Sequence, residues 1–325
     1  APKIQLYSIA VAGGEAILLD EGDEPAISPD SKWVAYIKNN QARIVAADGS
    51  VPARNLFYAK GSISHLQWSP DGSKLLFTAS RGDHSFTGIF KDSLSPVQWI
   101  DPAFARDQSP RWSPDGNNIV FVRRPASGGM PDSITVRQQD PWAIYTADIT
   151  TGKATRIWEA PGTLQGSVPA TNGGYNLHWA ANDRIVFVSY HDGWPHLYSI
   201  AAKGGAPLLL TPGNFMVEHV KLSHDKKWIV FSTNTGPDNF DYERRHIAKV
   251  PVDKAAMQIL TPGTGIETFP VVTGDNKTIA MFSADMQRPT VVATVPFAGG
   301  DLTLAGKDLI PADFPSTQFV MPKSV

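Results

Sequence analysis

The sequence of 325 residues contains no cysteine. Thiolate catalysis, cysteine-ligated zinc and disulfides are therefore excluded. No apolar run approaches the roughly 20 residues that a membrane-spanning helix needs, and we expect no membrane insertion. Charge is nearly balanced, because 29 Lys and Arg stand against 31 Asp and Glu, for a net charge of −2. The chain thus lacks the basic footprint of a nucleic-acid-binding protein, and we expect no nucleic-acid partner.

The chain begins Ala1-Pro2-Lys3, directly before a strand pattern, without an initiator Met or a charged-then-apolar signal segment. We expect that an upstream segment has been removed. Since the lack of cysteine is compatible with the periplasm, we expect a periplasmic or secreted bacterial protein, with the cytoplasm as the alternative.

One pattern recurs six times along the chain: an apolar strand, a polar tight turn and a second apolar strand. Two clear copies are LQWSPDGSKLLFT at 66–78 and PRWSPDGNNIVFV at 110–122. In the turn Ser-Pro-Asp-Gly, Pro presets φ, Asp can bond its own backbone, and Gly accepts a positive φ. Most copies start about 40 to 50 residues apart, the period of propeller blades. The other copies lie at 25–37, 177–188, 220–232 and 269–282.

Each copy is followed by further short strands, so a unit reads as four antiparallel strands without a helix. Such a sheet cannot bury both faces alone, and stacking sheets in a ring solves this problem. We therefore predict an all-β fold: a single β-propeller domain over 1–325 with about seven four-stranded antiparallel blades, six or eight being the alternatives. The predicted units lie near 21–61, 62–104, 105–163, 174–213, 214–263 and 264–305, with a half-blade at 3–20 and a C-terminal lead-out at 309–325.

Aromatic and acidic residues that recur from unit to unit are predicted to be structural. The tryptophans should pack between sheets rather than stack on a ligand, and the aspartates should be turn residues rather than a metal cluster. The tryptophans are Trp68, Trp112, Trp179 and Trp228, and the aspartates are Asp30, Asp71, Asp115, Asp183, Asp225 and Asp275.

Several stretches resemble the propeller domain of prolyl oligopeptidase family serine peptidases, especially the dipeptidyl-peptidase and acylaminoacyl-peptidase branches. They are DGWPHLY at 192–198, LTPG at 210–213, VEHV at 217–220 and ERRHI at 243–247. The Ser-Pro-Asp-Gly units are also similar to TolB-like and WD40-like repeats. The resemblance implies that nucleophile, acid and base lie on an α/β-hydrolase domain after the propeller. It also implies that the propeller gates the active site and selects peptide substrates.

The chain itself carries no recognisable catalytic machinery. It has no Gly-x-Ser-x-Gly nucleophile elbow and no alternating β and α pattern. We therefore expect no enzyme activity of the chain by itself, no catalytic residue, no metal and no cofactor. The expected partners are the C-terminal α/β-hydrolase domain and peptide substrates. The family's dipeptidyl-peptidases use an adjacent glutamate pair for the peptide amino terminus, and this sequence has none, which puts exopeptidase specificity in doubt.

Charged and aromatic residues of the fourth and fifth units are the candidates for substrate or partner binding. An arginine cluster can bind carboxylates bidentately, but an ion-pair cluster between blades is the alternative that we favour. A Gly-containing turn with an aromatic anchor is usually structural. The candidates are Glu218, His219, Glu243, Arg244, Arg245, His246, Asp192 and Trp194.

Two other functions stay open. The first is a stand-alone TolB-like propeller that binds proteins in the periplasm, and the second is a metal-dependent propeller lyase. Four histidines fall within about one blade, yet none has the spacing of a familiar metal site, so we favour separate, hydrogen-bonded histidines. They are His178, His191, His196 and His219. The polar insertion at 124–140 is predicted to form either an interaction or gating arm or a packed hairpin.

Overall fold

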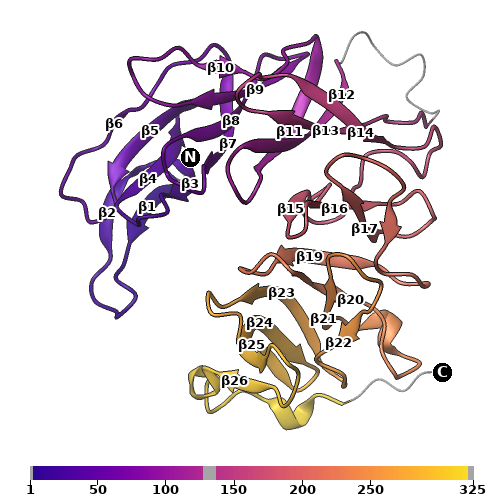
Figure 1. Ribbon diagram of the computed structural model, residues 1–325. Helices are drawn as coiled ribbons and strands as arrows, with labels where there is room; N and C mark the ends of the chain where they lie inside the picture. Colours follow the sequence, from indigo (N-terminus) through magenta and orange to yellow (C-terminus); the bar gives the residue numbers. More distant parts are fainter. Residues whose placement is uncertain (1–2, 127–136, 321–325) are drawn as a thin grey trace. The chain divides into compact units, whose positions relative to one another are not determined.

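The computed structural model describes residues 3–126 and 137–320 (Figure 1). Most of the insertion expected to form an arm lies outside these residues. The described chain consists of 26 strands and three short 3-10 helices, and none of these helices could span a membrane. The chain divides into two compact units, Ala1–Ala160 and Pro161–Val325.

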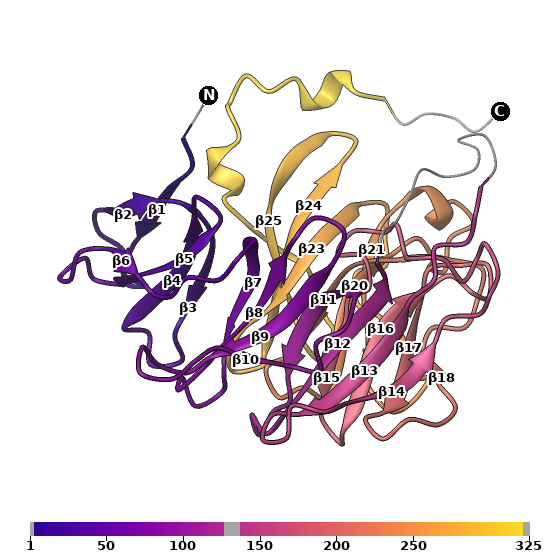
Figure 2. The same ribbon diagram turned by 90° about the horizontal axis from the view of Figure 1, so that it is seen from above.

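The first unit contains one hairpin and three groups of four antiparallel strands. A parallel pair between Arg106 and Ser85 joins the second group to the third, so β7 to β14 count as one sheet (Figure 2). The hairpin is β1 (Gln5–Ser8) and β2 (Ile17–Glu21), and the first group is β3 (Asp23–Ile27), β4 (Trp33–Lys38), β5 (Gln41–Ala46) and β6 (Arg54–Asn55). The second is β7 (Ser62–Trp68), β8 (Leu75–Ser80), β9 (Ser85–Phe90) and β10 (Gln98–Trp99), and the third is β11 (Ala105–Trp112), β12 (Asn118–Pro125), β13 (Ala143–Asp148) and β14 (Ala154–Glu159).

The second unit contains three four-stranded antiparallel sheets in which neighbouring strands follow one another in sequence (Figure 1). The first is β15 (His178–Ala180), β16 (Arg184–Ser189), β17 (His196–Ala201) and β18 (Leu208–Leu209). The second is β19 (Val217–Leu222), β20 (Trp228–Thr233), β21 (His246–Pro251) and β22 (Gln258–Ile259), and the third is β23 (Ile266–Val272), β24 (Thr278–Asp285), β25 (Arg288–Pro296) and β26 (Thr303–Ala305). The 3-10 helices are η1 (Asp241–Glu243), η2 (Lys307–Leu309) and η3 (Ser316–Gln318).

The predicted all-β fold of four-stranded antiparallel sheets is confirmed. The strands of each group fall within one of the six segments expected to form a unit, and β1 and β2 fall at the segment expected to form a half-blade, with β2 ending at Glu21. The number of blades and the single domain over 1–325 stay predictions.

The turn aspartates act as predicted in five of the six repeats. Each carboxylate accepts a hydrogen bond from the hydroxyl two residues earlier, and such bonds lower the pKa of Asp71 below its usual range. Where the turn needs a positive φ, two repeats have Gly72 and Gly116, at 71° each. The hydroxyl-to-carboxylate distances are 2.6 Å for Ser28–Asp30, 2.5 Å for Ser69–Asp71, 2.5 Å for Ser113–Asp115, 2.6 Å for Ser223–Asp225 and 2.7 Å for Thr273–Asp275.

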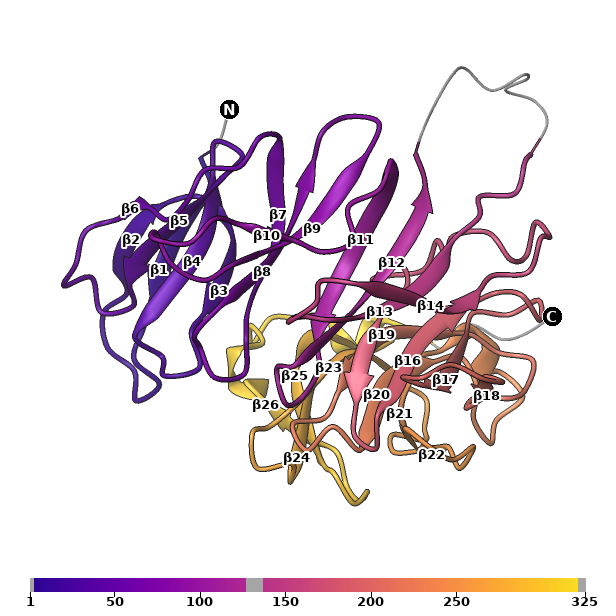
Figure 3. The same ribbon diagram turned by 45° about the horizontal axis from the view of Figure 1, so that its top comes forward.

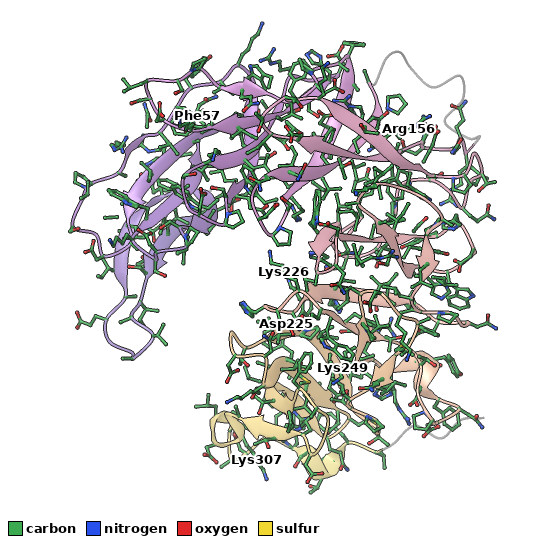
Figure 4. The ribbon with its side chains drawn as sticks, viewed as in Figure 1. Phe57, Arg156, Asp225, Lys226, Lys249 and Lys307 are labelled. Carbon is green, nitrogen blue, oxygen red and sulfur yellow. The ribbon has the colours of Figure 1, made fainter. Side chains whose placement is uncertain are left out.

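Two of the recurring tryptophans join consecutive groups of strands. The Trp68 indole N–H donates to the Ala26 carbonyl at 3.0 Å, and that of Trp112 donates to the Gln67 carbonyl at 3.1 Å. Packing between sheets is thus confirmed for these two residues. Trp228 differs, because it begins β20 and lies against Lys249, whose Nζ is 4.9 Å from the ring centroid. Figure 4 labels Lys249 on its strand.

The core of each unit consists of apolar layers between consecutive sheets. In the first unit, one layer gathers Ile63, Phe77 and Phe90, and Phe57 (labelled in Figure 4) stacks on the two phenylalanines with centroids 4.6 and 4.7 Å away. In the second unit, Phe231 is fully buried in the equivalent place on β20. Such burial stabilises the fold by about 25 cal/mol for each Å² of apolar surface removed from water.

A β-bulge recurs in the first strand of five groups. The register of β3, β7, β11, β19 and β23 shifts within the strand, and a residue other than glycine adopts a positive φ at each shift. At a bulge, two residues of one strand lie opposite a single residue of the partner strand, and the side chains at that point change direction. These residues are Glu24, His65, Ser109, His219 and Phe269, with φ between 50° and 57°.

Gly88 tests the packing of these layers. Gly88 on β9 lies opposite Phe77 on β8. A Cβ atom added to Gly88 would lie 2.5 Å from the Phe77 Cζ atom, and the Phe77 ring is fully buried. Gly88→Ala should lower the free energy of unfolding by about 1–3 kcal/mol, because the ring has no room to move. Urea denaturation measures the change. Gly274→Ala is the matched control, since a Cβ there meets nothing within 4 Å, and an equal loss in both variants would contradict this account.

Candidate functional site: the ionic cluster of β19, β21 and β23

Arg245 and Glu218 form the solvent-facing part of a charged cluster in the second unit. Arg245 directly precedes β21, and its Nε donates to the Glu218 carboxylate on β19. Its Nη1 donates to the Arg244 carbonyl at 2.9 Å. The side chains of Arg245 and Glu218 remain 26% and 23% exposed, so the pair is held in place and still reaches solvent.

His246 forms the buried part of the same cluster. The imidazole is fully buried, with Nε2 3.0 Å from Asp241 Oδ1 and Nδ1 3.7 Å from Glu267 Oε2. Each ring nitrogen thus faces a carboxylate oxygen. Burial alone would lower the pKa of His246, but the two carboxylates outweigh it and raise the pKa. The two carboxylates therefore stabilise the protonated form of the imidazole.

Asp241 ties this cluster to the loop before β21. Burial alone would raise the pKa of Asp241, but the Asp238 amide, His246 and Arg244 together lower it. The Asp238 amide donates to Asp241 Oδ2 at 2.8 Å, and Arg244 Nη1 donates to the carboxylates of both aspartates at 3.0 Å. Arg244 thus fixes the loop rather than offering a free guanidinium.

Two glycines make room for the buried carboxylates. A Cβ on Gly236 would lie 2.1 Å from Asp241 Oδ2, and one on Gly265 would lie 2.5 Å from Glu267 Oε1. The Ser283 hydroxyl donates to Glu267 Oε1 at 3.1 Å. The backbone at the two glycines therefore packs directly against these two carboxylate oxygens.

His219 adds an aromatic surface beside the ion pair. It occupies the bulge of β19, and its ring centroid lies 3.9 Å from that of Phe269, the bulge residue of β23. Its Nδ1 is 3.1 Å from the Ser232 hydroxyl. Burial lowers the pKa of His219, so the neutral ring is favoured at neutral pH. Phe269 is 48% exposed, so this aromatic pair faces solvent next to Glu218.

Three predicted candidates do not join the cluster. Glu243 lies exposed on η1, and no ion pair of the described residues includes it. Asp192 accepts from the Trp194 amide at 3.3 Å and lies 2.6 Å from His196 Nδ1, so both residues serve the turn between β16 and β17. The structural interpretation of this turn thus agrees with its contacts.

Two of the histidines weighed as metal ligands, His191 and His196, lie near Asp192 but have different hydrogen-bond partners. His196 is buried against Asp192, whereas His191 Nδ1 lies 2.8 Å from the Ser189 hydroxyl. Among residues 3–126 and 137–320, no group of three His, Asp or Glu side chains is arranged to hold a metal ion. The described chain therefore offers no candidate metal centre.

Sequence reasoning missed the buried carboxylates Asp241 and Glu267, which determine the cluster. The sequence did hold a signal for Glu267. When the first strands of the units are aligned, the residues equivalent to Glu267 in β7 and β19 are the apolar Ile63 and Val217. A charge at a core position predicts a buried partner. Asp241 carries no such signal, because it lies in the loop between β20 and β21 rather than on a strand with aligned repeats.

The first unit contains an equivalent buried ion pair. Asp107 on β11 is 1% exposed, and Arg123 Nε donates to its Oδ1 at 2.7 Å. Asp107 lies opposite Arg123 as Glu267 lies opposite Ser283. Both carboxylates thus lie at the same position of a first strand, but Asp107 pairs with the next strand of its own group, whereas Glu267 lies against His246 of the preceding sheet.

Residues 133–290, just under half of the chain, match the family model described as Dipeptidyl peptidase IV (DPP IV) N-terminal region. The matched segment includes the whole ionic cluster. The predicted resemblance to a dipeptidyl-peptidase propeller is thereby confirmed. No curated protein matches the sequence.

Solved structures share the fold at low sequence identity. Dipeptidyl peptidase 4 of Porphyromonas gingivalis has 14% identity and a TM-score of 0.66, over 91% of this chain and 47% of that one. The β-propeller domain of the Trilobed protease from Pyrococcus furiosus has 16% identity and a TM-score of 0.60, over 93% and 89%. An oligogalacturonate lyase in complex with manganese has 11% identity and a TM-score of 0.62, over 93% and 84%. These likenesses establish a β-propeller fold, and the chain spans about half the length of the dipeptidyl peptidase.

His246 should make stability depend on pH. Its pKa is raised in the folded state, so its stabilisation is full below the unfolded value of about 6.5 and is lost as pH rises through the folded pKa. Asp241 has the opposite pH dependence. Because its pKa is lowered in the folded state, its contribution to stability is full above the unfolded pKa of about 4 and is lost as the pH falls through the folded pKa. The cost of His246→Gln should therefore be largest near pH 5–6 and shrink above pH 7.

Urea denaturation of both proteins from pH 4.5 to 9 measures this difference. His224→Gln is the control, because His224 is exposed in the turn between β19 and β20. A pH-independent cost of His246→Gln would show that the imidazole is not charged in the folded state.

Proposed function

We propose that this chain is the propeller of a prolyl oligopeptidase-type serine peptidase, and that it gates and selects peptides for a C-terminal α/β-hydrolase domain. The match of residues 133–290 to the dipeptidyl peptidase IV N-terminal region carries the proposal. The described residues are all-β and the chain has no nucleophile elbow, so its contribution is binding rather than bond cleavage. A periplasmic or secreted location is part of the proposal.

The solvent-facing part of the ionic cluster is the proposed peptide contact. Arg245 can donate to a peptide carbonyl or carboxylate, and Glu218 can accept from an amide or ammonium group. The exposed Phe269 ring offers an apolar surface beside them. The ion pair of His246 with Asp241 and Glu267 lies beneath and holds the strands that carry these groups, which supports a preorganised site.

The first experiment asks whether a hydrolase domain follows the propeller. The coding sequence downstream of Val325 should contain a Gly-x-Ser-x-Gly segment within a hydrolase-sized continuation. The full protein should react with a fluorophosphonate probe at that serine, and residues 1–325 alone should not. A stop codon near Val325 together with a stable protein partner would instead favour the stand-alone TolB-like hypothesis. Activity that chelators abolish would favour the lyase.

The second experiment tests the peptide contact in that full protein. Arg245→Met should raise KM for peptides of several residues about tenfold, since a charged hydrogen bond is lost. It should leave kcat for a small ester unchanged, and it should change the free energy of unfolding by less than about 1 kcal/mol.

Arg156→Met is the matched control. Arg156, labelled in Figure 4, lies on β14 of the first unit and pairs with Glu159 at 2.8 Å on the surface. An unchanged KM in Arg245→Met, with the hydrolase active, would reject the contact but leave the peptidase assignment intact.

A further inference from the structure

A polar cavity of about 240 Å³ lies in the first unit and is lined by residues of β7, β8, β9 and β11 and of the turn between β8 and β9. Figure 3 shows the ribbons of these strands. Every residue around it belongs to this unit. Four hydroxyl side chains contribute to its wall: Ser64, Thr78, Ser80 and Ser85. Imidazole and amide groups make up most of the remaining polar wall, so the cavity differs from the charged cluster of the second unit.

The floor of the cavity holds a hydroxyl that lacks a partner. Thr78 is 4% exposed, and its Oγ1 makes no hydrogen bond within the part of the chain that the structure describes. Ser85 beside it is 6% exposed and donates to the Asp107 carbonyl at 2.7 Å, which leaves its oxygen able to accept. A buried hydroxyl without a partner destabilises a protein, and a ligand hydroxyl entering the cavity would supply that partner.

The charged groups of the cavity are engaged by the protein. Arg106 Nε donates to the Asp83 carbonyl at 3.1 Å, and its Nη2 donates to the Gly82 carbonyl at 3.3 Å, so this side chain holds the turn between β8 and β9. The Asp107 carboxylate accepts two hydrogen bonds from Arg123, at 2.7 and 3.1 Å. Neither charge calls for an ionic ligand.

The other polar groups both donate and accept. Hydroxyls, the Gln108 amide and a neutral imidazole each combine the two roles. His65 at the bulge of β7 is such an imidazole, since burial and the Arg111 charge lower its pKa against the opposing effect of Glu24. A wall of this kind matches a ligand whose own groups donate and accept, which is the property of sugar hydroxyls.

An aromatic edge adjoins the cavity. The His84 ring lines it and packs against Phe86 and Phe104, with centroids 5.0 and 5.3 Å away. Phe104 is 71% exposed. Aromatic rings offer an apolar face next to a polar wall, and the C–H face of a sugar ring is a suitable partner. The volume is below the range of about 300–1,000 Å³ for drug-sized ligands, so one ring is the appropriate size.

We infer that this cavity of β7, β8, β9 and β11 is a binding site for a single uncharged sugar ring, with Thr78 and Ser85 at its floor. The site is independent of the peptide contact, because it lies in the other unit.

Titration of the 325-residue chain with glucose, galactose, mannose and arabinose tests the inference by calorimetry and saturation-transfer NMR. At least one sugar should bind saturably, and Thr78→Val should weaken it about tenfold. Thr233→Val is the matched control, since Thr233 is also fully buried with an unpaired hydroxyl but lies on β20, and it should leave sugar affinity unchanged. Ser80→Ala, at the exposed rim, should weaken binding several-fold and keeps the test valid if Thr78→Val does not fold.

Acetate and inorganic phosphate are the opposing probes. Saturable binding of either anion that Thr78→Val abolishes, with no sugar bound, would overturn the inference in favour of an oxyanion site. Absence of saturable binding by every sugar, or equal sugar affinity in wild type, Thr78→Val and Ser80→Ala, would also overturn it.

Discussion

Burial of apolar side chains between consecutive sheets is the interaction on which the rest of the structure depends. A four-stranded sheet of this chain has two faces and too few residues to cover either, so its strands gain stability only against the next sheet. The fully buried phenylalanines of the second strands show this, since Phe77, Phe121, Phe187 and Phe231 each lie inside a layer. Because each sheet is stabilised only by packing against another sheet, the apolar pattern repeats from unit to unit, while the connecting segments vary in length.

Polar contacts within and between the strand groups include the residues of the candidate site. Tryptophan N–H groups reach the carbonyls of the preceding sheet at Ala26 and Gln67, and carboxylates are buried at one position of the first strand in both units. A buried carboxylate needs a cation or several donors, and each unit supplies them differently. Asp107 pairs with Arg123 of its own strand group, whereas Glu267 shares the His246 imidazole of the preceding sheet with Asp241.

The bulges of the first strands contribute side chains to both proposed binding sites. At each bulge the strand bends and a polar or aromatic side chain leaves the regular alternation. His219 and Phe269 meet in this way in the second unit, and His65 reaches the polar cavity in the first. A rigid scaffold with variable residues at equivalent bulges is consistent with the range of proteins that share this fold.

The sequence alone determined the repeat, the four-stranded antiparallel sheets and the role of the turn aspartates, and it indicated Glu218, Arg244, Arg245 and His246 as candidate site residues. These features follow from local chemistry, because turn residues and alternating apolar residues act within a few positions of one another. Only the tertiary structure decided that Arg245 pairs with Glu218, that His246 lies between Asp241 and Glu267, and that Glu243, Asp192 and Trp194 stand apart. It also revealed the bulges, since Glu24, His65 and Phe269 carry no local signal for a positive φ. The physical reason is that burial and partner choice depend on strands tens of residues apart, whose register no single segment specifies.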